Sequence, residues 1–390
     1  MNRHFVLALA LAISNAAFAQ TLQPPEVAAK NYLVIDLTSD KVLAQRDADA
    51  PADPASLTKL MTAYLVFGAI RDKKLTLEQT LPVSLRAWAE RRGGGSLMFI
   101  DTTMTPKVDE LLRGMIVQSG NDASVALAEA VGGTLEEFIS MMNAQASAWG
   151  LKNTRFKNVT GLTEAGHTST ARELAFIAAK VIRDHPSFYT YYSIPSYKYN
   201  NIAQPNRNLL LNRDPSVDGM KTGYTSAAGY CLIASAVREF PNLGEGGKEP
   251  GKRRLLSVLL NTTSMEARAG ESQKLLNWGF QAFDTVRLFD DAKPLATPEV
   301  WKGKTRVTKL GPAGGVFVTI PKGDSAKLQT RIERTDPLLA PLTRGQRVGT
   351  IKVATQSGEA VIDVPLVVLE PVEAGGLMAR AWDTIRLWIR

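Results

Sequence analysis

Residues 54–67 read PASLTKLMTAYLVF, and this stretch decides how the rest of the sequence is interpreted. Pro54 suits the first turn of a helix. The residues from 57 to 70 are apolar nearly all round, which is typical of a buried central helix. Because residues three apart on a helix are neighbours, Ser56 and Lys59 are predicted to lie side by side where this helix begins.

The chemistry open to this pair depends on the base that activates the serine. The chain has three histidines, His4, His167 and His185, which leave almost nothing from which to build a histidine-based triad. Lysine can serve if its pKa falls from about 10.4 toward about 7–8, and burial beside a second cation has that effect. The Ser56 N–H lacks an intrahelical partner and can face a developing oxyanion. The alternative is a capping Ser56 and a surface Lys59.

A second candidate motif, SGN at residues 119–121, lies between two helical stretches in the segment QSGNDAS. Alone, it is best interpreted as a helix cap formed by Ser119 or Asp122. In a site built on the first motif, Ser119 would relay a proton toward the leaving group. Asn121 would hold Lys59 and a substrate amide.

A third motif, KTG at residues 221–223 in VDGMKTGYTS, comes just before a predicted strand. Alone, it predicts only a turn that leads into that strand. In the catalytic interpretation, Lys221 is the second cation, which lowers the pKa of Lys59 and attracts a carboxylate. Gly223 lets a substrate backbone approach an exposed strand edge, and the Tyr224 N–H is the second oxyanion donor.

Each motif is a weak signal by itself, but each occurs once, and their order is that of the penicillin-recognising serine enzymes. The chain resembles the serine D-alanyl-D-alanine carboxypeptidases of the DacA/DacC type, which are low-molecular-mass penicillin-binding proteins. The similarity covers nearly the whole chain after the N-terminal segment and includes the stretches PASLTKLMTAYLVF, GGGSLMF, LLRGMIVQSGNDAS, NTRFKNVTGL, QPNRNLLL, VDGMKTGYTS and KLLNWGF.

The resemblance implies a fold with two parts. The first is an α/β (α+β) catalytic domain of the serine β-lactamase and transpeptidase type, with a five-stranded antiparallel sheet. The second is a C-terminal all-β sandwich. The residue patterns themselves predict strands at 31–36, 42–44, 229–237 and 254–262, and helices at 57–70, 125–131, 135–149 and 170–183.

By the same resemblance, Ser56 forms the acyl-enzyme, Lys59 is its base, and β-lactam antibiotics acylate Ser56. The other expected site residues are Ser119, Asn121, Lys221, Thr222, Gly223 and Tyr224, with Arg207 and Arg268 near the substrate carboxylate. No cofactor or metal is expected, because one cysteine, Cys231, and three histidines leave no ordinary zinc site.

Two features depart from related enzymes. Many relatives have histidine where this chain has Tyr224, a change that keeps the backbone donor and alters the side chain. Glu164 and Glu173 lie in about the region where class A β-lactamases carry a deacylating glutamate, but the surrounding pattern is absent. This absence and the extra β domain argue against a β-lactamase.

Length and composition are consistent with several globular domains. The 390 residues allow roughly two or three domains, and 45% hydrophobic with 22% charged residues excludes a disordered or fibrous chain. The net charge of +8 is explained either by solubility or by an anionic partner such as membrane lipid, nucleic acid or an acidic polymer. No dense basic run with interleaved aromatic residues indicates nucleic acid. The expected parts are a signal peptide at 1–19, a catalytic domain at 20–286, a β-sandwich at 287–373 and an amphipathic helix at 374–390.

The C-terminal parts have distinct patterns. Short β-type runs recur between residues 306 and 369, and Pro365 predicts that its strand lies at a sheet edge. Gly375 and Gly376 predict a hinge before the helical segment LMARAWDTIRLWIR. The apolar face of this segment, with two tryptophans and arginines opposite, suits residues 376–390 to a membrane interface. The alternative is a C-terminal helix docked on the protein.

Together these features predict a peripheral enzyme on the periplasmic face of the bacterial inner membrane, exported after cleavage near Ala19. It would remove the terminal D-alanine from peptidoglycan pentapeptide stems. Two alternatives stay open: a D,D-endopeptidase that cleaves cross-links, and a catalytically vestigial protein that binds peptidoglycan or maintains cell shape. The intact Ser56, Lys59, Asn121 and Lys221 argue against the vestigial alternative.

Overall fold

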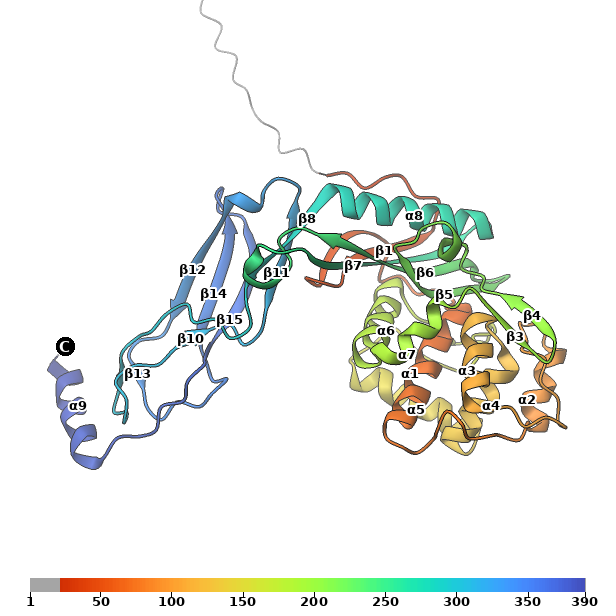
Figure 1. Ribbon diagram of the computed structural model, residues 1–390, viewed down its shortest axis with the longest axis horizontal. Coiled ribbons are helices and arrows are strands. Elements are labelled where there is room, and N and C mark those ends of the chain that lie inside the picture. The colour runs from red at the N-terminus through yellow and green to blue at the C-terminus, as the bar shows by residue number, and fades with distance from the viewer. Residues whose placement is uncertain (1–21, 390) are drawn as a thin grey trace, which may run out of the picture.

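The structure is a computed structural model that describes residues 22–389. The molecule is elongated, with an N-terminal part of mixed helices and strands and a narrower C-terminal part made mostly of strands (Figure 1). The predicted signal peptide, residues 1–19, lies outside the described residues.

A five-stranded antiparallel sheet runs through the N-terminal part, with the strand order β2-β1-β7-β6-β5. Its strands are β1 (Asn31–Asp36), β2 (Lys41–Arg46), β5 (Val217–Thr225), β6 (Gly229–Phe240) and β7 (Gly251–Thr262). A separate hairpin is formed by β3 (Ser196–Tyr199) and β4 (Ile202–Pro205). The predicted fold class, a mixed catalytic domain with an antiparallel sheet followed by a β domain, is confirmed.

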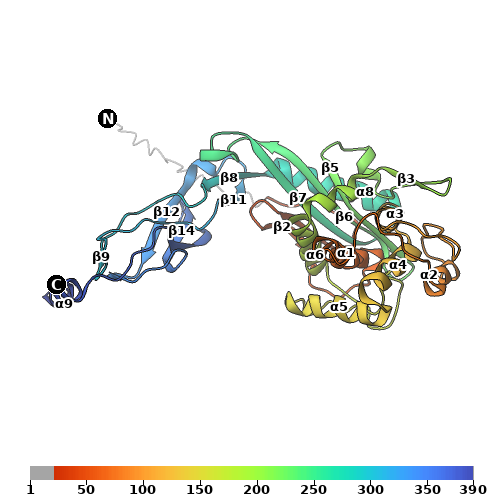
Figure 2. The same ribbon diagram turned by 60° about the horizontal axis from the view of Figure 1, so that its bottom comes forward.

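Helices cover both faces of this sheet, with α8 on one face and a cluster of helices on the other (Figures 1 and 2). The α-helices are α1 (Lys59–Arg71), α2 (Leu85–Ala89), α3 (Val108–Val117), α4 (Asn121–Gly132), α5 (Leu135–Ala148), α6 (Ala171–Asp184), α7 (Pro186–Tyr189) and α8 (Met265–Ala282). The short 3-10 helices are η1 (Ala55–Thr58), η2 (Glu90–Arg92), η3 (Thr190–Ser193), η4 (Leu209–Asn212) and η5 (Glu245–Gly247).

Strand β7 shows why both faces need cover. Leu256, Val258 and Leu260 belong to the core on the side of α1 and α6, whereas Leu255 and Leu259 belong to clusters that include residues of α8. Successive side chains of a strand point to opposite faces. A strand that is apolar at both sets of positions therefore has to be buried on both faces.

The buried central helix predicted from residues 57–70 is α1, and its first turn differs from the prediction. Residues 55–58 form the 3-10 helix η1, and the α-helix begins only at Lys59. Helix α8 was not predicted from residue patterns. Its sequence contains Gly270 and Gly279. A glycine in a helix interior makes the helix about 1 kcal/mol less favourable than alanine does, so the residues of α8 predict a helix only weakly.

The C-terminal part is built from small sheets, most of them antiparallel. Its strands are β8 (Phe283–Phe289), β9 (Val300–Trp301), β10 (Leu310–Gly311), β11 (Val316–Pro321), β12 (Leu328–Arg334), β13 (Leu338–Leu339), β14 (Arg347–Thr355) and β15 (Ala360–Val368), and η6 (Ser325–Lys327) precedes β12. One sheet has the order β10-β15-β14-β12, and β11 pairs with β8. Side chains that include Leu310, Ile351 and Leu366 of the four-stranded sheet form a core cluster with Val300 of β9 and Leu338 of β13, two strands that pair in parallel.

The strand that contains Pro365 is not an edge strand along its whole length. The sheet order places β15 between β10 and β14. Strand β10 pairs only with Val367 and Val368, however, while Pro365 pairs with Thr350 of β14. Pro365 therefore lies where β15 has a described partner strand on one side, which agrees with the absence of an N–H donor in proline.

A buried carboxylate joins the two parts of the molecule. Asp36, at the end of β1, accepts hydrogen bonds from Arg253 Nε of β7 at 2.7 Å, Thr285 Oγ1 of β8 at 2.6 Å and Thr319 Oγ1 of β11 at 2.8 Å. The side chains of Arg253 and Asp36 are both fully buried. A buried ion pair needs additional hydrogen bonds to offset its desolvation, and here strands from both parts supply them.

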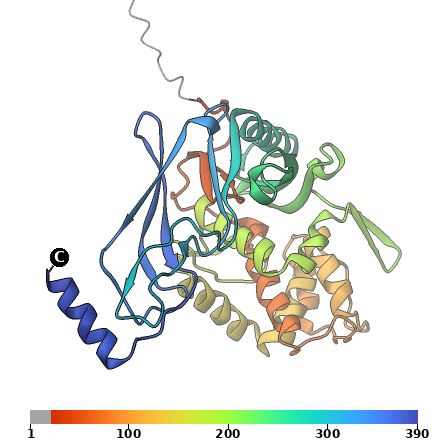
Figure 3. The same ribbon diagram turned by 60° about the vertical axis from the view of Figure 1, so that its left-hand side comes forward.

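The C-terminal helix, α9 (Leu377–Ile389), docks on the β part through polar groups (Figure 3). Asp383 is buried, and its Oδ2 accepts the backbone N–H of Lys302 at 2.7 Å. The Gly375 N–H donates to the Lys302 carbonyl at 2.8 Å, so the first residue of the predicted hinge is hydrogen-bonded to the β part. Within residues 22–389, none of the helices has the length and apolar character that crossing a bilayer requires.

Candidate active site

Ser56 and Lys59 lie where η1 passes into α1. The Nζ atom of Lys59 lies 3.1 Å from Ser56 Oγ. The same Nζ donates to Asn121 Oδ1 at 2.7 Å and to the carbonyl oxygen of Thr160 at 2.6 Å. Two oxygen acceptors thus hold the amine against the serine hydroxyl.

The amine of Lys59 is enclosed by protein, and the residue is 1% exposed. Burial lowers the pKa of Lys59 to about 7, while the Glu90 carboxylate opposes this shift and the Arg207 guanidinium adds to it. The sequence assigned the second cation to Lys221. The Arg207 guanidinium is a further cation that lowers the pKa of Lys59, and the charges of Lys59 and Lys221 also oppose each other. A lysine that is partly neutral at physiological pH can accept a proton from a hydroxyl group.

The second motif is held in place by its own backbone and by Asp122. Ser119 has a φ of 68°, in the left-handed region that residues other than glycine seldom occupy. Asn121 is the first residue of α4, which brings its amide to Lys59. Asp122 is buried, and its carboxylate accepts the backbone N–H groups of residues 98–100 and of Ala123. Asp122 thus ties the start of α4 to a distant segment, whereas the N-cap of the helix is Gly120 and has no side-chain cap, so the cap predicted for Ser119 or Asp122 is not formed.

The third motif lies within the edge strand β5, not in a turn before a strand. Lys221 is buried, and its Nζ donates to Ser119 Oγ at 2.9 Å and to the Thr222 carbonyl at 3.0 Å. Burial lowers the pKa of Lys221 well below its usual value, and the charge of Lys59 lowers it further. Ser119 therefore links the second motif directly to the third.

Strand β5 lies close to the serine because it carries glycine at position 223. A Cβ atom at Gly223 would lie 3.1 Å from Ala55 Cβ and 3.3 Å from the Ser56 nitrogen. Contacts this short leave little space for a larger residue. The glycine thus permits the edge strand to approach η1.

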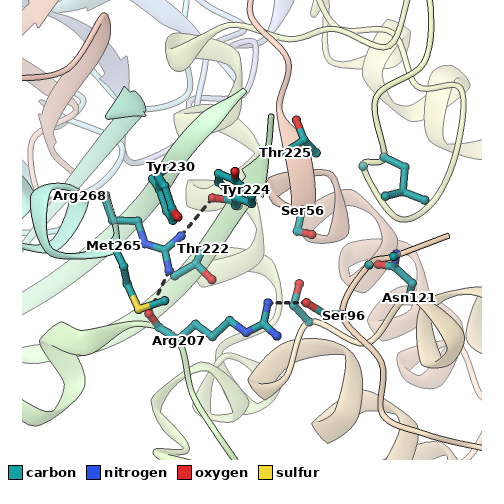
Figure 4. A pocket seen from close by; sticks show the side chains of 16 residues that line it. Ser56, Ser96, Asn121, Arg207, Thr222, Tyr224, Thr225, Tyr230, Met265 and Arg268 are labelled. Atoms are coloured by element: carbon teal, nitrogen blue, oxygen red, sulfur yellow. Dashed lines mark hydrogen bonds between the residues drawn. The ribbon is translucent and has the colours of Figure 1, made fainter. Parts of the chain in front are cut away.

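Two arginines line the cleft: Arg268 lies across it from Ser56, and the side chain of Arg207 extends from that side toward Ser96 (Figure 4). Arg268, on α8, donates to the Gly223 carbonyl at 3.1 Å and to the Arg207 carbonyl at 3.2 Å. Arg207 donates to Ser96 Oγ. Burial lowers the pKa of Arg268 to about 10, which leaves it charged at neutral pH. Thr222 lines the same side, so this wall can bind a carboxylate.

The side chain of Tyr224 forms part of the rim of the cleft. It is 53% exposed, and its ring centroid lies 4.3 Å from that of Tyr230. An aromatic pair thus lies directly after the third motif at the rim of the cleft.

Acidic side chains are absent from the part of the cleft wall that the structure describes. Glu164 Oε2 accepts Asn158 Nδ2 at 3.0 Å, and Glu173 Oε2 accepts Thr154 Oγ1 at 2.5 Å. Neither glutamate lines the cleft. Between residues 22 and 389 there is also no cluster of three histidine, cysteine, aspartate or glutamate side chains that could hold a metal ion.

Several groups that contact the site residues were given no role in the sequence analysis. The Thr160 carbonyl binds Lys59, Ser96 binds Arg207, and Tyr230 packs on Tyr224. A backbone carbonyl leaves no trace in residue type. Thr160 and Ser96 do lie in the stretches NTRFKNVTGL and GGGSLMF that carried the resemblance, which was the available signal.

Comparison with known families agrees with this geometry. Residues 18–243 match the family described as D-alanyl-D-alanine carboxypeptidase. The chain belongs to this family. Residues 283–374 match the C-terminal domain of penicillin-binding protein 5. The predicted family and the predicted class of enzyme, a hydrolase with carboxypeptidase activity, are thereby confirmed.

Named members of the family align with this chain over nearly its whole length. The D-alanyl-D-alanine carboxypeptidase DacC of Escherichia coli is 41% identical over 378 residues, which are 95% of this chain and 91% of DacC. DacA of the same organism is 38% identical over 97% of this chain and 94% of its own length. The crystal structure of penicillin-binding protein 5 from Haemophilus influenzae superposes with a TM-score of 0.83 at 38% identity, covering 90% of this chain and 99% of that one.

Proposed function

We propose that this chain removes the terminal D-alanine from peptidoglycan pentapeptide stems through an acyl-enzyme formed on Ser56. The observation that carries the proposal is the buried Lys59 amine, 3.1 Å from the Ser56 hydroxyl. The positively charged wall opposite, with Arg207 and Arg268, fits the carboxylate that ends a D-Ala-D-Ala peptide.

In the first half of the reaction, neutral Lys59 takes the hydroxyl proton while Ser56 Oγ attacks the carbonyl carbon of the penultimate D-alanine. The N–H groups of Ser56 and Tyr224 donate to the developing oxyanion. The peptide C–N bond breaks, and the proton that Lys59 took from Ser56 passes to the leaving nitrogen through Ser119, whose Oγ accepts a hydrogen bond from Lys221. This transfer returns Lys59 to its neutral form. Free D-alanine departs, and the stem remains as an ester on Ser56.

In the second half, water hydrolyses that ester. Lys59 accepts a proton from the water, whose oxygen attacks the ester carbonyl, and the serine oxygen leaves and is protonated. Lys59 is the base for both halves because the cleft wall, where described, offers no carboxylate for the task. β-Lactams enter the same path, since opening of their strained amide gives the corresponding ester on Ser56.

The test is the release of D-alanine from a pentapeptide that ends in D-Ala-D-Ala. The wild-type protein is expected to release it, and the Ser56→Ala variant is expected to lose at least a factor of about 10³ in rate. Equal rates in the two proteins would contradict the proposal. A protein of vestigial activity would release nothing in either form, and digestion of cross-linked muropeptides would reveal endopeptidase activity.

We also propose that the protein is exported and lies on the periplasmic face of the inner membrane, bound through α9. The polar side of α9 is occupied by the Asp383 contact with the β part. Its apolar side is left exposed: Met378 and Trp388 are each 90% exposed, and Trp382 is 59% exposed. A helix with this distribution of side chains suits the boundary between lipid headgroups and acyl chains.

The membrane proposal is tested by deleting residues 376–390 and fractionating cells. Release of active protein into the soluble periplasmic fraction is the expected result. Retention of the truncated protein with the membrane would contradict the role of α9. The deletion removes only residues after the β part, so D-alanine release by the purified protein should be unchanged.

A further inference from the structure

The segment from Lys157 to His167 contacts the helical turn that carries Ser56 and Lys59. Lys59 Nζ donates to the Thr160 carbonyl at 2.6 Å, and Thr62 Oγ1 donates to the Val159 carbonyl at 2.9 Å. Both acceptors are backbone atoms, so their positions depend on how firmly the segment itself is held.

Direct packing adds to these hydrogen bonds. Gly161 has a φ of 83°, and a Cβ atom placed on it would lie 1.8 Å from the Ala55 carbonyl oxygen. Ala55, the residue before the serine, has a φ of 45°, which is unusual for a residue with a side chain. A conformation of this kind persists only where its surroundings hold it. The segment and the turn are therefore fitted against each other without free space.

His167 supplies the side-chain contact between them. It is buried, and its Nδ1 lies 3.1 Å from the backbone nitrogen of Lys157, which can only donate. Burial lowers the pKa of His167 to about 4, so the ring is neutral at physiological pH and carries its one proton on Nε2. That Nε2 lies 2.8 Å from Thr58 Oγ1. The hydrogen bond from the Lys157 N–H thus fixes the tautomer of His167, and the Nε2–H of the ring is directed at Thr58.

Thr58 lies between the two reacting side chains in the sequence Ser56-Leu57-Thr58-Lys59 and is itself buried. It is the last residue of η1. Among the described residues, no other side chain of η1 forms a hydrogen bond with the 157–167 segment. Because Thr58 lies between Ser56 and Lys59 in the chain, a shift of Thr58 would change how these two side chains face each other.

We propose that His167 is a positioning residue for acyl transfer: by donating from Nε2 to Thr58 Oγ1, it fixes the turn so that the Ser56 hydroxyl and the Lys59 amine meet. The inference rests on the proposed function, because it assigns His167 to the same site. His167 does not line the cleft. It therefore acts on the rate of acylation and not on the noncovalent binding of substrate.

The experiment is a double-mutant cycle on Thr58→Val and His167→Leu, with the rate constant for acylation by benzylpenicillin as the readout. Valine keeps the shape of threonine and lacks its hydroxyl. A lost hydrogen bond and a shift of the nucleophile predict about a tenfold fall for each single variant. The double variant should fall by about the same factor, and not by the product of the two, because both substitutions remove one interaction. The noncovalent dissociation constant should stay within about twofold of wild type.

Two further variants separate positioning from stability. Glutamine can accept from Lys157 and donate to Thr58 with one side chain, so His167→Gln should restore acylation to within about threefold of wild type. His185 is the matched control: it is also buried and also packs on α1, where its ring centroid lies 4.8 Å from that of Tyr64 and 5.6 Å from that of Phe67. His185→Leu should change thermal stability and leave the acylation rate of the folded protein unchanged.

The outcomes distinguish this inference from the function on which it rests. Suppose that benzylpenicillin acylates the wild-type protein, but that the double variant loses the product of the two single losses in acylation rate. This result would overturn the role of His167 and leave the proposed function in place. Equal losses in His167→Gln and His167→Leu, or a fall in the His185 variant as large as that in the His167 variant, would also overturn it. A wild-type protein that benzylpenicillin does not acylate would overturn both.

Discussion

The carbonyl oxygen of Thr160 lies 2.6 Å from Nζ of Lys59. This contact joins α1 to a segment about a hundred residues further along the chain. Together with Asn121 Oδ1, it occupies two of the directions open to the amine and leaves the serine hydroxyl as its third neighbour. Its surroundings therefore permit Lys59 to act as a base because they both bury it and orient it.

Lys59→Arg should abolish acylation while keeping a positive charge at this position. Arginine does not lose its proton in proteins, so it cannot accept one from Ser56. Loss of a general base predicts a fall of about 10²–10⁴ in the acylation rate constant, measured with a fluorescent penicillin. Acylation within about threefold of wild type would show that another group is the base.

The acylation rate should depend on pH through Lys59. Its pKa is lowered to about 7, so the neutral, proton-accepting form predominates above that pH and is lost below it. The rate constant should reach a plateau above about pH 8 and fall roughly tenfold for each pH unit below 7. Stopped-flow measurements between about pH 5 and pH 9 test this, and a flat profile would contradict a titrating lysine base.

Arg268→Gln should reduce recognition of the terminal carboxylate. Hydrogen bonds to a charged group contribute about 1.5–3 kcal/mol, so kcat/KM for a D-Ala-D-Ala peptide should fall by about 10–100-fold. The matched substrate is the same peptide with its C-terminus amidated. The wild type should discriminate strongly between the two peptides and the variant only weakly, whereas equal discrimination would exclude Arg268 from carboxylate binding.

Asp122→Asn should destabilise the protein. The Asp122 carboxylate accepts four backbone N–H groups, and an amide can accept with only one of its two terminal atoms. Each buried donor left unsatisfied costs about 1–3 kcal/mol. Thermal unfolding should begin several degrees lower. Asp49→Asn is the control, because Asp49 forms a largely exposed pair with Arg172 and such pairs contribute little; equal shifts in the two variants would contradict the assignment.

Replacing both Trp382 and Trp388 by glutamate should abolish binding to vesicles of phosphatidylethanolamine and phosphatidylglycerol. Both rings are exposed on the apolar side of α9, and charges there oppose insertion into the interface. Leu85→Glu is the control, because Leu85 is 77% exposed on α2 in the N-terminal part. Co-sedimentation measures the bound fraction, and equal binding by the tryptophan variant and the control would exclude α9 as the anchor.

The sequence allowed Ser56 and Lys59 to be predicted as neighbours because helical spacing is a local property. The resemblance was needed to bring the three motifs together, because neighbouring motifs are up to about a hundred residues apart. No local rule reveals that Lys221 Nζ lies 2.9 Å from Ser119 Oγ. The role of Arg207 in the pKa of Lys59 was missed because charge acts through space, and the Thr160 contact was missed because its acceptor is a backbone atom. A docked C-terminal helix was one of the two alternatives, but the part played by Asp383 was not predicted, because an acidic residue on the polar face of a helix is expected to be solvated and not buried.

The most direct test of this account is to treat the wild-type protein and the Ser56→Ala variant with benzylpenicillin and to locate the adduct by mass spectrometry of the digested protein. The account predicts one benzylpenicilloyl group on the wild-type protein, attached to Ser56, and none on the variant. An adduct on another residue, or equal labelling of the variant, would contradict it.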